Sequence, residues 1–323
     1  MNTPALPAHS PAAALQGAVQ LDDWGVIRAS GADAQRFLHG QLTQDIEHLE
    51  PGAARLAGFC SAKGRLLASF VIWRSGDAVL LACSADLLPA ALKRLQMFVL
   101  RAQCKLTDAS AELRLWGLAG AAATEALGAT APAAVWTTAR VGDADVDVEV
   151  VRLPDGAADG HPVPRWLWAG DAPPPALPAL DAELWRGLEA ASGVARIVNA
   201  TVEQFVPQMI NFELVGGVNF QKGCYPGQEI VARSQYRGTL KRRAQVLHAG
   251  VPLLPGQEVF HDADPGQPAG RVVLGGAGAD GSHIGLVELK LSALAGGTLH
   301  LAAAEGPLLS VGALPYAIPM EPA

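Results

Sequence analysis

The most informative part of the chain spans twelve residues and reads Lys222-Gly223-Cys224-Tyr225-Pro226-Gly227-Gln228-Glu229-Ile230-Val231-Ala232-Arg233. Two glycines flank the cysteine and permit backbone conformations that other residues resist, while the proline stiffens the turn. The residues from Gln228 onward favour a helix in which Glu229 and Arg233 stand four apart, in the order that suits an ion pair. The stretch therefore predicts Cys224 on a constrained loop just ahead of a helix N-terminus.

Two interpretations of Cys224 follow from this setting. Lys222 lies two residues before it, the basic run 241–243 could fold back nearby, and both positive potential and a helix N-terminus stabilise a thiolate. These features favour a reactive or ligating cysteine. A free cysteine is also commonly a small, buried and inert residue. The residues alone leave both interpretations open.

The composition is that of a folded chain with a sizeable core. Of its 323 residues 50% are apolar and 17% are charged, which excludes a disordered protein. The net charge of -7 argues against nonspecific coating of nucleic acid, so no stable nucleic-acid binding is expected. The histidines lack metal-ligand spacing and the cysteines form no CxxC pair, so we predict no metal site and a reducing cytoplasm. The four cysteines are Cys60, Cys83, Cys104 and Cys224.

The N-terminal residues predict neither a targeting segment nor a membrane anchor. Residues 1–20 are rich in Ala and Pro and contain no Lys or Arg, whereas secretory and mitochondrial leaders need basic residues. Nowhere does the chain approach the roughly 20 apolar residues of a membrane span. We expect residues 1–18 to form a disordered tail and the protein to be cytoplasmic.

The hydrophobic pattern predicts an α+β fold in three parts. Two strand-and-helix domains, 19–112 and 113–240, are followed by short strands separated by Gly and Pro in 241–323, a pattern typical of a small antiparallel β-barrel. Within the first domain, residues 30–33 resemble a capping box ahead of a helix, and helical spacing continues over 86–99. A further helix is expected over 181–192.

The signature segment, as we call residues 222–233, resembles the K-G-C-[FY]-x-G-Q-E-x-x-[AS]-R pattern of the YgfZ family, relatives of the glycine-cleavage T-protein. The resemblance spans roughly residues 20 to 318. Its other motifs are Leu21-Asp22-Asp23-Trp24, Gly40-Gln41-Leu42-Thr43-Gln44-Asp45, Lys63-Gly64-Arg65, Phe205-Val206-Pro207-Gln208, Tyr236-Arg237-Gly238 and Lys241-Arg242.

The resemblance implies a T-protein-like fold, in which the two strand-and-helix domains and the barrel surround a central folate pocket. It implies binding of tetrahydrofolate, or a one-carbon derivative, and support for the assembly or repair of iron–sulfur enzymes, including tRNA-modifying ones. Trp24 and Trp185 match the family's folate-binding tryptophans, and Cys224 is its functional thiol. The implied functional motif comprises Lys222, Gly223, Cys224, Tyr225, Gly227, Gln228, Glu229 and Arg233.

The folate site can also be considered from the residues. A ring for stacking and a carboxylate for the donor edge of the pterin would share one helix face if Trp185 and Glu189 stand four apart. Without the resemblance, a core tryptophan and a solvated carboxylate are the favoured interpretation. Candidate cations for the anionic tail are Arg233, Arg237 and Lys241, and Tyr236 is a further candidate folate-binding residue. The cysteine is expected beside this pocket.

Enzymatic aminomethyl transfer is not expected. T-proteins carry two acidic residues before a strand, and the stretch 63–74 places Ala68 and Ser69 at those positions, where neither can carry the charge. Two alternatives to the accessory role remain: a folate-dependent one-carbon transferase that uses Cys224 as nucleophile, and a noncatalytic docking module. The basic groups at 63–65 and 241–243 could contact a partner or tRNA phosphates, although such groups are usually solvated.

Overall fold

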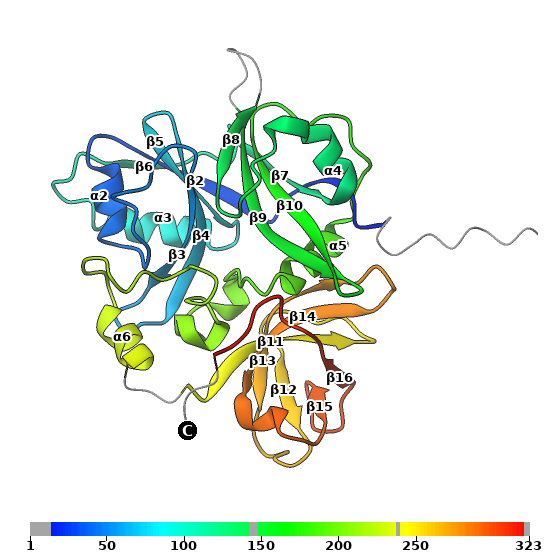
Figure 1. Ribbon diagram of the computed structural model, residues 1–323. Coiled ribbons are helices and arrows are strands. Elements are labelled where there is room, and N and C mark those ends of the chain that lie inside the picture. The colour runs from blue at the N-terminus through cyan, green and yellow to red at the C-terminus, as the bar shows by residue number, and fades with distance from the viewer. Residues whose placement is uncertain (1–13, 142–147, 237–239, 320–323) are drawn as a thin grey trace, which may run out of the picture.

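The computed structural model describes residues 14–141, 148–236 and 240–319, and every structural statement below concerns these residues. Two antiparallel sheets lie side by side, with a closed barrel beneath them (Figure 1). The mixed helices and strands and the closed antiparallel barrel confirm the expected fold class.

The first sheet has the strand order β3-β4-β5-β2-β6. Alternate residues of β4 enter two different cores: Phe70 packs with helices α2 and α3, and Val71 packs toward the second sheet. Burial on both faces explains why these strands are almost continuously apolar. The elements are β2 (Trp24–Ser30), α2 (Ala34–His39), β3 (Ala54–Cys60), β4 (Leu66–Ser75), β5 (Ala78–Ser84), α3 (Leu88–Gln96) and β6 (Lys105–Asp108).

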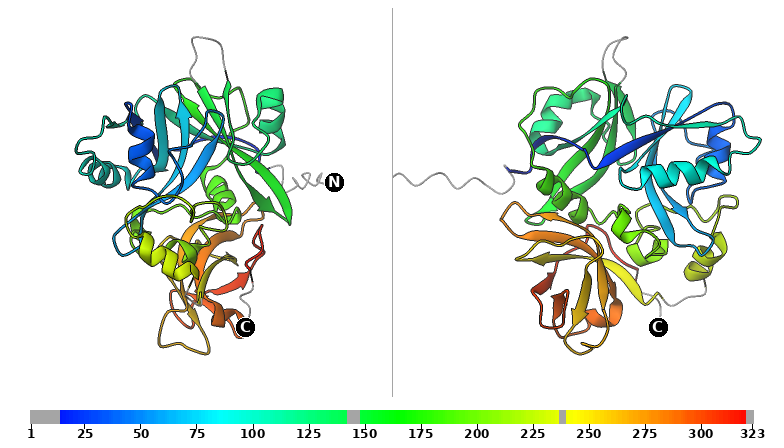
Figure 2. Two further views of the ribbon diagram at one scale, coloured as in Figure 1. Left: turned by 60° about the vertical axis from the view of Figure 1, so that its left-hand side comes forward. Right: turned by 180° about the vertical axis from the view of Figure 1, so that it is seen from behind.

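The start of α2 differs from the expected capping box. No side chain caps this helix, and the Asp33 carboxylate instead accepts a hydrogen bond from the backbone N–H of Gln103 at 2.7 Å. The capping-box prediction was wrong because Asp33 is engaged by a segment 70 residues away. Helix α3 is also shorter than the periodicity suggested, and it lies across the first sheet when the molecule is seen from behind (Figure 2).

The second sheet has the order β1-β7-β10-β9-β8 and is covered by α4 and α5. Its edge strand β1 comes from the N-terminus, so residues 17 and 18, which the sequence assigned to the tail, are paired with β7. Residues 1–13 lie outside the described part. The elements are β1 (Gly17–Gln20), β7 (Arg114–Ala119), α4 (Gly120–Leu127), β8 (Thr138–Val141), β9 (Val148–Ala158), β10 (His161–Gly170) and α5 (Ala182–Ala191), with a 3-10 turn η1 (Gly128–Thr130).

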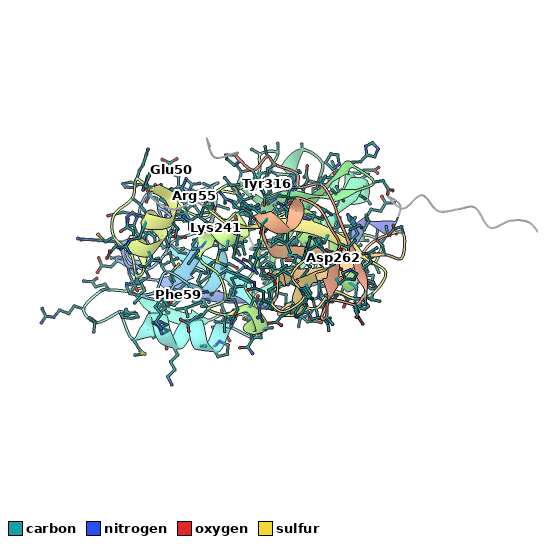
Figure 3. The ribbon with its side chains drawn as sticks, turned by 90° about the horizontal axis from the view of Figure 1, so that it is seen from below. Glu50, Arg55, Phe59, Lys241, Asp262 and Tyr316 are labelled. Carbon is teal, nitrogen blue, oxygen red and sulfur yellow. The ribbon has the colours of Figure 1, made fainter. Side chains whose placement is uncertain are left out.

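The barrel closes in the order β11-β14-β13-β12-β15-β16, with Leu247, Val259 and Val287 in its core. Its elements are β11 (Arg242–Ala249), β12 (Glu258–His261), β13 (Gly270–Ala277), β14 (His283–Lys290), η4 (Leu291–Leu294), β15 (Leu299–Leu301) and β16 (Leu308–Val311). The C-terminal residues return from the barrel toward α5. In the view from below, Lys241 and Tyr316 lie between Phe59 of the first sheet and Asp262 of the barrel (Figure 3).

The connection from α5 to the barrel packs on the first sheet, although the sequence-based division grouped it with the second domain. Phe205, Phe212 and Val231 belong to the same core as the first sheet, and the backbone N–H of Leu66 bonds to the Phe205 carbonyl at 2.9 Å. This connection contains η2 (Asn199–Thr201), η3 (Pro207–Ile210) and α6 (Gln228–Tyr236). In Figure 1, α6 lies beside the ends of β3 and β4.

The described residues contain neither a helix suited to a membrane nor a cluster of metal ligands. None of their helices is long and apolar enough to cross a membrane. Nor do three or more of their His, Cys, Asp or Glu side chains gather into a group that could hold a metal ion.

Candidate functional site

A buried ion-pair network lies between α5 and the first sheet. Arg196, on the extended segment after α5, donates to both carboxylate oxygens of Glu189 at 3.1 Å and to Asp23 Oδ2 at 2.9 Å. It also donates to the Ser84 hydroxyl at 3.0 Å. Burial alone would lower the pKa of Arg196, but the carboxylates of Glu189 and Asp23 outweigh it and raise the pKa. Arg196 therefore remains a cation held by acceptors from three segments.

This network orients Trp24. The guanidinium carbon of Arg196 lies 4.7 Å from the centroid of the Trp24 ring, within the range of a cation–π interaction. The indole nitrogen of Trp24 is buried and has no hydrogen-bond partner among the described residues. A buried donor without a partner is costly, and a bound acceptor would relieve that cost.

The central pocket, as we call it, is a small hollow of about 40 Å³ between the two sheets and the α5 end. Three aromatic side chains and three charged ones define its chemistry, and they are Trp24, Phe70, Trp136, Arg165, Glu189 and Arg196. Two larger hollows adjoin it. One, of about 530 Å³, shares Glu189 and Arg196 with it; the other, of about 570 Å³, shares Trp136 and Ser192.

Arg165 is the unusual residue of the central pocket. It is 3% exposed, and its Nε and Nη2 atoms both donate to the Pro154 carbonyl, at 3.1 and 2.9 Å. No carboxylate of the described residues lies within ion-pairing distance of it. Burial lowers the pKa of Arg165 to about 10, with Glu189 and Asp155 partly offsetting that effect. A buried cation without a paired carboxylate makes the pocket attractive to an anion or a strong acceptor.

The structure brings together only part of the folate-binding set expected from sequence. Trp24 and Glu189 line the central pocket, as expected of pocket residues. Trp185 does not line it: the indole is 1% exposed, and a Cβ placed on Gly117 would come within 2.7 Å of it. Its ring supports Arg165 instead, whose guanidinium carbon lies 5.1 Å from the ring centroid. Trp185 and Glu189 therefore do not share this cavity as expected: Glu189 lines it, whereas the ring of Trp185 packs against Arg165 and Gly117.

The remaining candidate residues lie elsewhere. Arg233 and Tyr236 project from α6, are 63% and 70% exposed, and do not line the central pocket. Arg233 pairs with Glu229 at 3.1 Å, which confirms the expected helix ion pair, while Tyr236 packs edge-on against Phe220. Lys241 is exposed, and Arg237 lies outside the described residues.

Most of the basic run after the signature segment is engaged in ion pairs within the folded chain. Arg242 pairs with Glu288 of the barrel, and Arg243 is buried against Glu213 and the Gln208 carbonyl. The pre-signature residue Gln208 donates in turn to the Val231 carbonyl of α6 at 2.8 Å. These cations therefore hold the barrel against η3 and α6.

The signature loop, residues 222–227, is fixed at both ends. The Lys222 ammonium donates to the His39 carbonyl and, at 2.7 Å, to the Leu42 carbonyl, so it satisfies backbone groups where α2 ends. Its Nζ atom also lies 4.9 Å from the centroid of the buried Tyr225 ring. Burial lowers the pKa of Lys222 to about 8, against the opposing effect of Asp45 and Cys224.

At the other end, Gly227 meets the β3–β4 turn. Its φ of +81° is a left-handed conformation, and a Cβ there would lie 2.4 Å from the Ser61 carbonyl oxygen and 2.7 Å from the Gly64 Cα. Cys224, between these two anchors, is exposed and takes part in no disulfide among the described residues. The constrained loop ahead of a helix is as the sequence predicted, since α6 begins at Gln228.

The thiol and the central pocket are separate, contrary to the expectation that they adjoin. Cys224 is not among the residues that line the central pocket. The signature loop contacts the turn of the β3–β4 hairpin at Gly64, whereas the pocket uses the middle of that hairpin at Phe70. Leu66, where β4 begins, stands four residues before Phe70, and four residues of extended strand correspond to roughly 13 Å.

Sequence reasoning missed Arg165 and Arg196. Arg165 stands alone between apolar and aromatic residues in β10, and a single cation inside a buried strand is the signal that could have identified it. Arg196 carried no local signal, because its partner Asp23 lies 173 residues away.

Comparison with known proteins identifies relatives along most of the chain. The chain is 34% identical over 247 residues to the tRNA-modifying protein YgfZ of Edwardsiella ictaluri, covering 73% of this chain and 72% of the relative. It is 29% identical to the protein of that name from Sodalis glossinidius over 93% of both chains. The protein of that name from Klebsiella pneumoniae is 31% identical over 73% of this chain and 72% of its own. No protein-family model matches the sequence.

Among solved structures, the glycine cleavage system aminomethyltransferase T from Bartonella henselae matches with a TM-score of 0.68 at 16% identity, covering 93% of this chain and 86% of that one. This likeness shows a shared fold and confirms the T-protein-like architecture. The sequence relatives carry the closer relationship: with 34% identity across more than two thirds of both sequences, the chain belongs to the YgfZ family.

Proposed function

We propose that this protein binds a reduced folate, tetrahydrofolate or a one-carbon derivative, in the central pocket. We propose further that it supports the assembly or repair of iron–sulfur enzymes, including tRNA-modifying ones, with Cys224 as its functional thiol. The relatives' name, tRNA-modifying protein, supports the second part. The first part rests on the chemistry of the pocket.

The observation that carries the folate proposal is the buried Arg165. A guanidinium that is 3% exposed and lacks a paired carboxylate needs a partner, and a folate offers carbonyl, ring-nitrogen and carboxylate acceptors. The indole N–H of Trp24 has no hydrogen-bond partner among the described residues, and an acceptor atom of the ligand would satisfy it in the same way. Both groups line or border one pocket.

The other pocket residues also fit a folate. Trp24, Phe70 and Trp136 offer apolar faces to a flat pterin. Each Glu189 oxygen accepts one hydrogen bond from Arg196 and keeps a second lone pair for a pterin donor. The central pocket, at about 40 Å³, is too small for a pterin by itself, and the adjoining hollows of about 530 and 570 Å³ offer the room for the ligand. When bound, a reduced folate supplies a carrier for one-carbon units.

A one-carbon transferase is the less favoured alternative. Ala68 is fully buried, and the Ser69 hydroxyl accepts a hydrogen bond from the Ile197 backbone N–H at 2.9 Å. Neither supplies a carboxylate to the pocket. Cys224 also lies away from the central pocket, so it is poorly placed to attack a folate-bound carbon.

Calorimetric titration with tetrahydrofolate tests the proposal, with Arg165→Met compared against Arg152→Met. Both arginines are buried in the second sheet over a tryptophan ring, but Arg152 pairs with Asp155 at 2.5 Å and does not line the central pocket. Loss of a charge-assisted hydrogen bond to the ligand should cost about 1.5–3 kcal/mol, a roughly 10- to 100-fold weaker affinity, in Arg165→Met alone. Wild-type affinity in Arg165→Met, or no heat with the wild type, would refute folate binding at this pocket.

The role of Cys224 is tested in cells. Because Cys224 is exposed and lies outside the pocket, Cys224→Ala should fold normally and bind tetrahydrofolate with unchanged affinity. We expect it to fail in restoring tRNA modification by iron–sulfur enzymes to a strain that lacks the wild-type copy. The partly buried Cys104 provides the control, since Cys104→Ala should restore it. Full restoration by Cys224→Ala would show that Cys224 is not the functional thiol.

A further inference from the structure

A histidine–aspartate pair lies against the signature loop. His39 ends α2, and its Nδ1 atom lies 2.9 Å from Asp45 Oδ1, with the two side chains 14% and 26% exposed. Burial would raise the pKa of Asp45, but hydrogen bonds from His48 and His39 outweigh it and lower the pKa, so the carboxylate stays ionised. The Glu47 backbone N–H also approaches Nδ1, at 3.4 Å. Because an ionised carboxylate only accepts hydrogen bonds, the shorter contact of 2.9 Å with Asp45 assigns the proton to Nδ1 and leaves a lone pair on Nε2.

The free side of this imidazole faces the loop that carries Cys224. A Cβ placed on Gly223, the neighbour of Cys224, would lie 3.5 Å from His39 Nε2. Lys222 is bonded to the His39 carbonyl, so two consecutive residues before the thiol contact His39. Nε2 has no hydrogen-bond partner among the described residues. Proton transfer would require the exposed Cys224 side chain to turn toward the ring.

The charges around the pair come from three elements. Arg36 shares α2 with His39, Glu47 and the 78% exposed His48 follow Asp45, and Lys222 and Tyr225 lie on the signature loop. Burial and Cys60 raise the pKa of Tyr225, so its phenol stays neutral near pH 7. Lys222 is the cation that faces both Asp45 and Cys224. A thiolate at Cys224 would thus form next to a cation and a base.

We propose that His39, oriented by Asp45, is the proton acceptor for Cys224 in thiol–disulfide exchange with a disulfide-bearing partner. The inference rests on the part of the proposed function that makes Cys224 the working thiol, and it is independent of folate binding. The Cys224 proton moves to His39 Nε2, and the thiolate attacks one sulfur of the partner's disulfide. That S–S bond breaks, a Cys224–partner disulfide forms, and the departing thiolate takes the proton back from the imidazolium. No external oxidant or reductant is needed.

The test uses the folate-free full chain and oxidised glutathione as the disulfide probe, with mass spectrometry following glutathionylation at Cys224. The wild type should react about threefold to tenfold faster than His39→Gln at pH 7, and this difference should shrink at higher pH, where the thiol ionises without a base. Asp45→Asn should show a smaller loss in the same direction.

His48→Gln is the matched control. His48 also bonds to Asp45, at 2.9 Å, but its ring is exposed and lies outside the contact with Gly223, so its rate and profile should match the wild type. An unchanged rate and pH profile in His39→Gln overturns the inference. Tetrahydrofolate affinity should be unchanged in all variants, so failure here leaves the folate proposal standing, and the converse also holds.

Discussion

Lys222 shows how one buried cation can join two motifs that are distant in sequence. Its ammonium satisfies carbonyl groups at the end of α2, 183 and 180 residues away, while its stem packs beside Tyr225. These contacts hold the first residues of the signature loop against His39. The position also removes the ammonium from water, and that burial lowers its pKa to about 8 from the ordinary 10.5.

The lowered pKa of Lys222 predicts a defined pH dependence of stability. Between about pH 8 and 10.5 the unfolded chain binds more protons at this residue than the folded chain, so the free energy of unfolding should rise with pH across this window. Urea titrations at pH 8 and 10 should show the wild type gaining stability relative to Lys222→Met. The exposed Lys63 is the control, because Lys63→Met should show no such change. A flat difference for Lys222→Met would contradict the prediction.

At the scale of elements, the β3–β4 hairpin connects the two candidate sites. Its middle lines the central pocket through Leu56 and Phe70, and its turn at Gly64 receives Gly227 and Ile230 of the signature segment. The hairpin thus sets the separation between the central pocket and the thiol. The close approach of the two glycines is what permits α6 to dock at the turn.

Substitution of Gly227 should detach the signature segment from this hairpin. Gly227→Ala would force a Cβ to within 2.4 Å of the Ser61 oxygen at a positive φ, so we expect a loss of about 2–4 kcal/mol in the free energy of unfolding. Gly76→Ala is the matched control, since its φ of +56° is also positive but nothing lies within 4 Å, and a loss of about 1 kcal/mol is expected. Hydrogen exchange in α6 should accelerate only in Gly227→Ala. Equal losses in the two variants would show that the docking contact contributes nothing.

At the scale of the whole molecule, the three parts share their cores. One core runs from the first sheet through Phe205 and Val231 to Val246 and Leu286 of the barrel, and a second joins the two sheets around Trp73. The C-terminal segment adds a strap, since the Tyr316 hydroxyl donates to the Gly193 carbonyl at 2.7 Å and accepts from the Asn211 amide at 3.2 Å. The central pocket therefore lies among parts that hold one another in place.

Removal of the Tyr316 hydroxyl tests this strap. Tyr316→Phe deletes two hydrogen bonds while keeping the ring, so the free energy of unfolding should fall by about 1–2 kcal/mol. Tyr236→Phe serves as the comparison: Tyr236 is 70% exposed, and its hydroxyl bonds to no described residue, so stability should not change. Urea titration of both variants checks the prediction, which fails if the two behave alike.

The amino-acid sequence by itself determined the family motif, the barrel strands and the loop ahead of α6, and the family resemblance implied a pocket role for Trp24 and Glu189. The strands and the loop are readable because periodicity, turn residues and fixed spacings are local properties of the chain. Only the tertiary structure decided that Trp185 packs against Arg165 outside the pocket lining, that Arg165 lacks a paired carboxylate among the described residues, and that the signature loop contacts His39 away from the pocket. Burial and charge pairing depend on residues far apart in sequence, as Arg196 and Asp23 illustrate across 173 positions, and no local pattern encodes them.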